Sequence, residues 1–446
     1  MRNRWRSNLE VYPPKAARPF ATGHSLTYLT WLCVLLMFGV LAFGAVEIWA
    51  TSILEISAAV LCTMVVVDRI CFCGMSVKWN PLFPPMLGFA IVLTLQLVFN
   101  LTAYRYVTLL ACMQYIAYGA LLFTVTQLEL DEPSSNLLVV AFVVFGSSVA
   151  ILAMCQSLGS SPHIYWLRAP QVGAEFFGPY FNRNHYAGMM EMLTPFALVL
   201  SFSGLIHGCQ RVLAAFATVV MGASIVLSLS RGGVGSLLCE LFLFFWIISA
   251  IQSHRVVLPW ILLLAGCVFV FLFFIGSPAT WSHLEEVHET FRPELFRDSL
   301  TMFARKPILG WGFGTFPTVY PAFRSFYTTL FVNAAHDDYL QVLVETGTVG
   351  FTFVVWFMVV LYCKGLPLCR DASTSWRGVL RLATLLGCTG VAVHSSLDFN
   401  LQIPANAALF FVSCALATSL PKDKPSTLRF GRMWVYGSEA TLAAPR

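Results

Sequence analysis

Charged residues are scarce in this chain of 446 residues. Asp, Glu, Lys and Arg make up 11% of the sequence, whereas soluble domains carry about a quarter. Hydrophobic residues make up 58%, and the mean hydropathy is +0.74. This composition excludes a soluble enzyme with one anchor and indicates an integral membrane protein. The net charge of +5 is small and dispersed, so it gives no argument for nucleic-acid binding.

Two other patterns are missing. Strand-like alternation of polar and apolar residues is absent, which disfavours a membrane barrel. The 13 cysteines are scattered, and Cys71 and Cys73 lack the second pair that a zinc site needs, so we expect small buried hydrophobic residues. No clear cleavage pattern follows the long first apolar run, which therefore reads as a first span.

Apolar stretches of membrane-crossing length recur from end to end. We count about 12 of them, at the ~20 residues that one span requires. The fold class predicted is therefore an all-α polytopic membrane protein. The spans lie near 27–46, 49–67, 84–103, 106–126, 137–157, 185–205, 212–230, 233–251, 256–276, 340–363, 378–396 and 403–420.

The distribution of positive charge predicts the orientation. An even number of spans puts both termini on one side, and that side then holds 18 of the 27 lysines and arginines, which predicts cytoplasmic termini. The predicted organisation has cytoplasmic tails at 1–25 and 421–446, and nine spans within 26–276. A large periplasmic loop follows at 277–339, and three more spans lie within 340–420.

The large loop is too rich in aromatic residues to be disordered, and loops of this length are usually functional. Within segment 292–305, Phe296, Leu300 and Phe303 recur at helical spacing. We expect an amphipathic helix that lies on the membrane surface or folds back into it.

Four polar segments interrupt the apolar sequence, and the predicted topology puts all four on the periplasmic side. Ionisable groups at a membrane face are costly and are functional candidates by default. The segments are 181–188, 228–233, the large loop with 292–314 and 336–340, and 394–402.

Each segment also has a plainer interpretation. Arg231 could cap a helix C-terminus, and His336 could be an ordinary interfacial histidine. His394 and Asp398, one helical turn apart, could hydrogen-bond each other. The glycines of 310–314 do not fit a nucleotide-binding pattern. His283 and His288 lie among glutamates without the spacing of a metal site, so a solvated surface segment is the better interpretation.

Together the segments suggest one chemistry. Arginines stay charged and bind phosphate in a bidentate fashion. A histidine can remove a proton from an attacking hydroxyl near neutral pH. Since no acidic cluster has clean metal-ligand spacing, arginine would replace a metal at a diphosphate. The combination suits glycosyl transfer from a membrane-bound polyprenyl diphosphate, with no nucleotide and no other cofactor.

Four motifs, in this order, resemble the O-antigen ligase/polymerase superfamily of bacterial glycan-assembly proteins. The resemblance extends over roughly residues 140–420. The motifs are GPYFNRNHYA at 178–187, SRGG at 230–233, Arg292 followed by KPILGWGFG at 306–314, and AHDDYL at 335–340 with Glu345 and Gly347.

The resemblance implies a helical bundle with a large periplasmic loop in the bacterial inner (cytoplasmic) membrane. It implies a metal-independent, inverting glycosyltransferase that moves a glycan from undecaprenyl diphosphate to an acceptor. That acceptor is lipid A–core, another glycan repeat unit or a protein side chain, and the sequence does not separate the three. Carried over, Arg231 and Arg292 hold the diphosphate and His336 is the base. The expected substrate-binding residues are Asn182, Arg183, Asn184, Asp337, Tyr339 and His394.

One departure concerns Asp337, where the family commonly has asparagine. A carboxylate there could raise the pKa of His336 and hold its tautomer, or could repel the diphosphate. The rival class is a transporter or lipid-linked oligosaccharide flippase without catalysis, which would have polar residues in mid-span. Here the spans are nearly free of charge at their centres, with Glu191, Glu240 and Glu345 as the few exceptions. A membrane scaffold, the third class, leaves the one-sided arginines unexplained.

Overall fold

The computed structural model describes residues 22–72, 77–159, 162–170, 175–251, 291–329 and 331–419, and within these ranges every regular element is a helix. The long helices are α1 (Thr22–Leu41), α2 (Ile48–Phe72), α3 (Phe83–Val98), α4 (Arg105–Gln127), α5 (Glu132–Leu158), α6 (Arg183–Phe202), α7 (Cys209–Leu227), α8 (Arg231–Ile251), α11 (Arg292–Arg305), α13 (Asp338–Gly365), α14 (Trp376–His394) and α15 (Pro404–Ser419).

Short helical elements connect the long ones. They are η1 (Phe43–Ala45), α12 (Phe316–Val319), η3 (Tyr320–Ala322), η4 (Leu366–Asp371) and η5 (Asn400–Gln402). Several long helices start at a side-chain cap that satisfies a backbone N–H of the first turn. Asp131, Asn182, Asp337 and Ser375 have this role for α5, α6, α13 and α14.

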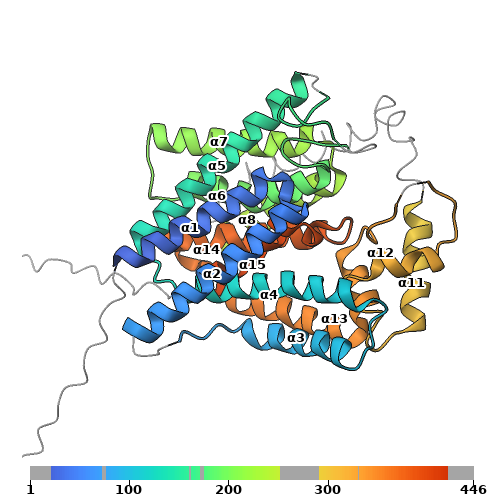
Figure 1. The fold of residues 1–446 in the computed structure, drawn as a ribbon. Helices are drawn as coiled ribbons and strands as arrows, with labels where there is room; N and C mark the ends of the chain where they lie inside the picture. Colours follow the sequence, from blue (N-terminus) through green and yellow to red (C-terminus); the bar gives the residue numbers. More distant parts are fainter. Residues whose placement is uncertain are drawn as a thin grey trace, which may run out of the picture.

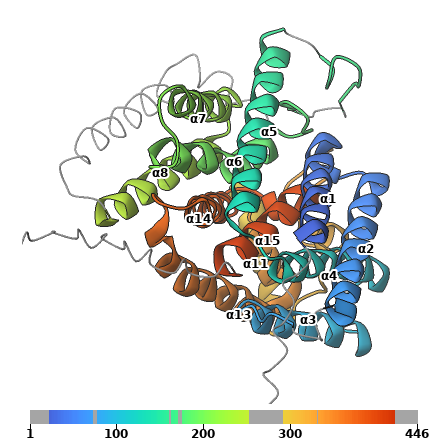
Figure 2. The ribbon, with the colours of Figure 1, turned by 90° about the vertical axis from the view of Figure 1, so that its left-hand side faces the viewer.

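Helices α6 and α14 form the centre of the bundle. Both are buried along almost their whole length, and they pack against each other. Gly387 of α14 makes this approach possible, because a Cβ there would lie 2.8 Å from the Met192 Cα. Figure 2 looks along the bundle and shows α14 and α6 near its middle, with α5, α7 and α8 on one side and α3 and α13 on the other.

The all-helical fold is confirmed for the described residues. Every predicted span except 256–276 coincides with a long helix, and 256–276 lies outside the described residues. Six described helices are long and apolar enough to cross a membrane, namely α2, α4, α5, α7, α8 and α13. Helices α6 and α14 are not among these six, because their composition is less apolar. The total of about 12 spans at ~20 residues each stays a prediction.

The described part of the large loop folds across one end of the bundle, at the right of Figure 1, where α11 and α12 lie beyond the start of α13. Its core includes Leu295, Met302, Phe316, Tyr320 and Val344. The loop is therefore an ordered cap that joins α11 to α13. Its periplasmic location stays a prediction.

The bounds predicted for the amphipathic helix, 292–305, agree with α11, but the face that packs on protein is not the face of Phe296 and Leu300, whose contact with the membrane surface stays a prediction. The helix buries Leu295, Asp298, Ser299 and Met302, whereas Phe296 and Leu300 are exposed. The reason is that the loop supplies its own apolar partners, Phe316 and Tyr320, on the other side of the helix. Its inner face therefore contacts protein.

Candidate functional site

His336 lies in the segment just before α13, with its side chain 31% exposed. Its backbone has φ +53°, a left-handed conformation that is uncommon for a residue with a side chain. Its Nδ1 lies 3.1 Å from Oδ1 of Asp398, and its ring packs edge-on against Phe399 with ring centroids 4.8 Å apart. Two contacts thus fix the ring and leave its Nε2 edge for another partner.

Asp398 is the centre of this site. It is 1% exposed and comes from the turn between α14 and α15. Besides His336, its carboxylate accepts hydrogen bonds from Asn184 Nδ2 and from the Phe399 backbone N–H. Burial alone would raise the pKa of Asp398, but the hydrogen bond and charge of His336, with the charges of His185 and His394, hold it well below its usual range. Asp398 is therefore a carboxylate that orients an imidazole.

Arg292, the first residue of α11, also lies at this turn. Its guanidinium donates to the Leu397 carbonyl at 3.0 Å and lies 4.0 Å from Asp398 Oδ2. The side chain is 38% exposed, so it contacts the buried carboxylate and is also accessible from outside. The structure thus brings together His336 and Arg292, which the sequence predicted to cooperate.

Arg231 begins α8, two residues after a left-handed residue, Leu229, with φ +58°. Ser230 caps the helix, because its Oγ accepts from the Gly233 N–H at 3.1 Å. Gly233 allows close packing on α6, since a Cβ there would lie 2.6 Å from the Cβ of Ala187. Arg231 lies at the N-terminus of α8, a position that attracts anions, and not in the last turn of a helix.

His394 is not open to a ligand, contrary to its prediction as a substrate-binding residue. It is 1% exposed, and its Nδ1 lies 2.8 Å from Oε1 of the buried Glu191. The expected hydrogen bond between the His394 and Asp398 side chains is also absent among the described contacts. Instead, the backbone N–H of Asp398 donates to the His394 carbonyl.

The segment 182–184 is divided between structural roles and the site. Asn182 caps α6 by accepting from the Asn184 N–H at 2.8 Å. Arg183 pairs with Glu175 at 3.0 Å. The side chain of Asn184 reaches Asp398. Of these three substrate-binding candidates, only Asn184 contacts the site.

Asp337 and Tyr339 hold helices together. Asp337 caps α13 by accepting from the Leu340 N–H at 2.9 Å, and burial raises its pKa, although helix N–H groups oppose this. The Tyr339 hydroxyl donates to the Ala392 carbonyl of α14 at 2.7 Å. The possibility that Asp337 holds the tautomer of His336 is not realised in this structure, because Asp398 contacts His336 Nδ1 and Asp337 caps α13.

The glycine-rich motif and Glu345 form a structural joint. The buried Glu345 carboxylate accepts from the Gly314 and Phe316 N–H groups at 2.8 and 3.0 Å. Gly347 has φ +66°, and a Cβ there would lie 2.2 Å from the Ile308 carbonyl oxygen. Only glycine allows the loop to approach α13 this closely. The motif fixes the loop that carries Arg292 and His336.

Sequence reasoning missed Asp398 as a site residue, although it placed the segment 394–402 on the same face. The sequence feature that could have identified Asp398 is its position as a carboxylate between two apolar spans. Among the described residues, no group of three His, Cys, Asp or Glu side chains is arranged to hold a metal ion. His283 and His288 lie outside the described residues.

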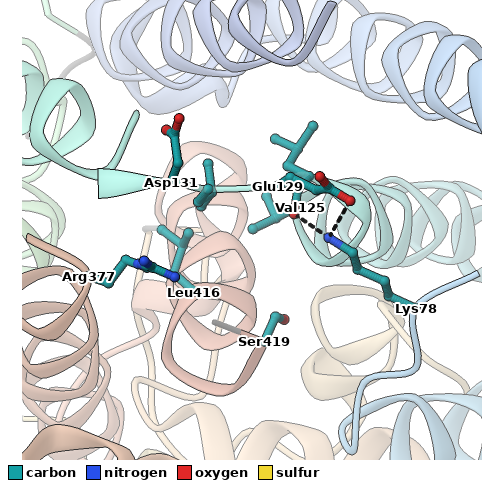
Figure 3. Close-up of a pocket in the computed structure, with 9 residues that line it drawn as sticks. Lys78, Val125, Glu129, Asp131, Arg377, Leu416 and Ser419 are labelled. Carbon is teal, nitrogen blue, oxygen red and sulfur yellow. Dashed lines mark hydrogen bonds and ion pairs between the residues drawn. The ribbon is translucent and has the colours of Figure 1, made fainter. Parts of the chain in front are cut away.

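A cavity of about 340 Å³ lies elsewhere, at the opposite ends of α4, α14 and α15 (Figure 3). Lys78 and Arg377 reach it from different walls, with Glu129 and Asp131 above them. Helices of 16 to 23 residues separate it from His336, a span of about 24–35 Å. It is therefore not part of the His336 site.

Comparison with known proteins connects this geometry to a family. Residues 216–355 match the family model described as O-antigen ligase, which supports the O-antigen ligase/polymerase superfamily for this chain. The matched segment contains Arg231, Arg292, His336, Glu345 and Gly347. No curated protein matches the chain. The family acts on lipid-linked glycans, and the apolar helices fit a multi-pass membrane protein.

Proposed function

We propose that this chain of the O-antigen ligase/polymerase superfamily transfers a glycan from undecaprenyl diphosphate to an acceptor hydroxyl at the periplasmic face of the inner membrane, with both termini cytoplasmic. The observation that carries the proposal is the contact between His336 Nδ1 and the buried Asp398, at 3.1 Å. It leaves Nε2 as the nitrogen that can take a proton. The acceptor is lipid A–core, a glycan repeat unit or a protein.

In the proposed step, Nε2 of His336 removes the proton of the acceptor hydroxyl. The acceptor oxygen forms a bond to the anomeric carbon, and the bond from that carbon to the diphosphate oxygen breaks. The diphosphate leaves with the bonding electron pair, so the anomeric centre is inverted. The proton passes from His336 to water. General-base help of this kind is worth roughly 10²–10⁴-fold in rate.

Asp398 has two functions in this step. Its hydrogen bond holds the Nδ1–H tautomer of His336, and its charge stabilises the imidazolium that forms. Asn184 and the Phe399 N–H keep the carboxylate in place. A buried carboxylate with these partners is pre-organised, so little reorganisation accompanies proton transfer.

Arg231 and Arg292 would bind the diphosphate and offset the charge that develops on it. Arg292 is exposed enough to reach a ligand while its guanidinium donates to Leu397. Arg231 adds its charge to the N-terminus of α8, where backbone N–H groups favour anions. The proposed reaction needs no metal ion, because two guanidinium groups supply the positive charge.

The test uses purified protein, a synthetic polyprenyl-diphosphate glycan and candidate acceptors, with a chelator present. We expect release of the lipid diphosphate and formation of product. His336→Ala and Arg231→Ala should abolish both in protein that still unfolds cooperatively in a thermal melt.

Arg297→Ala is the control on α11, since Arg297 lies on the exposed side of the helix that Arg292 begins. It should keep full activity. Full activity in His336→Ala and Arg231→Ala would overturn the site. Solute or lipid flux in liposomes without glycan transfer would favour the flippase alternative.

A further inference from the structure

Three ionisable side chains are buried together next to the site. Glu191 of α6, Glu240 of α8 and His394 of α14 are each no more than 1% exposed. A Cβ on Gly390 would lie 1.7 Å from Glu240 Oε1 and 3.2 Å from Glu191 Cβ, so the two glutamates meet at α14. We call these three residues the buried cluster.

Burial of these three side chains is energetically unfavourable. Both oxygens of Glu240 and Oε2 of Glu191 are buried without a hydrogen-bond partner among the described residues. Buried polar atoms of this kind destabilise a fold, and ionisable groups inside membrane helices are rare outside functional sites. Because its burial destabilises the fold, we infer that the buried cluster has a functional role in positioning the residues around it.

His394 lies between the start of α8, which carries Arg231, and the turn that carries Asp398. One edge of its ring faces Glu191, at 2.8 Å from Nδ1. The other edge faces α8, since a Cβ on Gly232 would lie 2.6 Å from Nε2 and 2.5 Å from Cδ2. Gly232 directly follows Arg231, so the imidazole is the surface on which the start of α8 rests.

The backbone of His394 supports the turn that carries Asp398. Its carbonyl accepts the N–H groups of Leu397 and Asp398, which begin the turn that reaches His336 and Arg292. One residue thus contacts the arginine helix through its ring and the Asp398 turn through its carbonyl. The orientation of the ring depends on Glu191.

We propose that Glu191 and His394 are positioning residues that hold Arg231 in place relative to the His336–Asp398 pair. The inference rests on the proposed function and names what sets the spacing between the diphosphate-binding arginine and the base. Neither side chain contacts substrate, because both are buried in the bundle.

The first experiment uses two glycines of α8. Gly232→Ala puts a methyl group against the His394 ring, whereas a methyl group at Gly235 would have nothing within 4 Å, which makes Gly235→Ala the matched control. We expect Gly232→Ala to lower kcat/KM for the lipid donor about tenfold, the scale of coupling between contacting residues. Gly235→Ala should leave it unchanged.

His394→Asn removes the ring edge at Gly232 and keeps a nitrogen near the Nδ1 position for Glu191. In this background Gly232→Ala should cause no further loss of kcat/KM, because the methyl group no longer clashes with the imidazole ring. An equal loss from Gly232→Ala in both backgrounds, or an equal loss from Gly235→Ala, would overturn the inference.

The second experiment is a double-mutant cycle between Glu191→Gln and Arg231→Lys, read as kcat/KM. We expect Glu191→Gln to lower kcat/KM about tenfold in the wild type. If Glu191 and His394 act through Arg231, this loss of kcat/KM nearly disappears when Arg231 is already replaced. Additive losses would mean a purely structural role and overturn the inference. A wild type without glycan transfer would instead overturn the proposed function, and the inference with it.

Discussion

The two ends of the bundle use charge differently. At the end that holds the cavity, opposite charges pair at the surface: Lys78 with Glu129 at 3.8 Å, and Arg377 with Glu132 at 2.9 Å. These side chains are between 22% and 47% exposed. At the other end, one buried carboxylate, Asp398, has His336, Asn184 and Arg292 as neighbours.

This difference separates charges that stabilise a surface from charges arranged for chemistry. Exposed pairs contribute about 0–1 kcal/mol each. Removing one partner of a buried pair costs about 3–5 kcal/mol, because the other charge is left buried. Substitutions at the cavity end should therefore be tolerated, and those around Asp398 should not.

The largest effect is expected for Asp398→Asn. The amide keeps the shape of the side chain but removes the charge that orients His336 and stabilises its protonated form. We expect kcat to fall by about 10²–10⁴-fold, the range for general-base catalysis, in the lipid diphosphate release assay. Glu129→Gln at the cavity end is the control and should keep full activity. A loss below about threefold in folded Asp398→Asn protein would contradict this role, since it is far under that range.

The second effect compares two glycines with positive φ. Gly208, at the cavity end, has φ +53° and nothing within 4 Å, so Gly208→Ala should cost about 1–2 kcal/mol for the left-handed backbone alone. Gly347 has φ +66° and faces the Ile308 carbonyl. Gly347→Ala should lower the melting temperature clearly more and should also impair transfer. Equal melting temperatures would mean that the loop moves aside freely.

The third effect is the pH dependence of stability. The folded-state pKa of Asp398 is lowered, so its stabilising contribution is present above the ordinary Asp pKa, about 4, and is lost as pH falls below it toward the folded-state value. The stability difference between the wild type and Asp398→Asn should shrink as the pH falls from about 5 to below about 4. Thermal melts across this range measure it.

Asp131 is the comparison at the cavity end. Its hydrogen bond to Ser134, as the cap of α5, lowers its pKa as well, although burial opposes this. Asp131→Asn should therefore show the same direction of pH dependence with a smaller amplitude, because the residue is exposed. A larger amplitude at Asp131 than at Asp398 would reverse the proposed contrast between the ends.

The sequence predicted the helices well because membrane spans leave a strong apolar signal. Side-chain partners were harder to predict. Asp337 adjoins His336, and from the sequence it could either hold the His336 tautomer or repel the diphosphate, but the start of α13 uses it as a cap. The true partner, Asp398, lies 62 residues away in the chain, and only the fold brings it to His336. In the sequence, His394 and His336 are both histidines in polar segments between spans. Only the structure shows that His394 is buried against Glu191, whereas His336 is partly exposed.

The smallest effect is expected for Glu129→Gln. Its carboxylate lies 3.8 Å from Lys78, and the side chain is 47% exposed. The buried Arg69, 3.9 Å away, keeps its hydrogen bond to the Gln127 carbonyl when Glu129 is replaced. Water and salt screen such pairs, so the loss of unfolding free energy should stay below about 1 kcal/mol and shrink further as salt is raised. Melting curves at low and high salt measure it. A salt-independent loss of several kcal/mol, or a loss of glycan transfer, would mean that this end also carries a buried, coupled network.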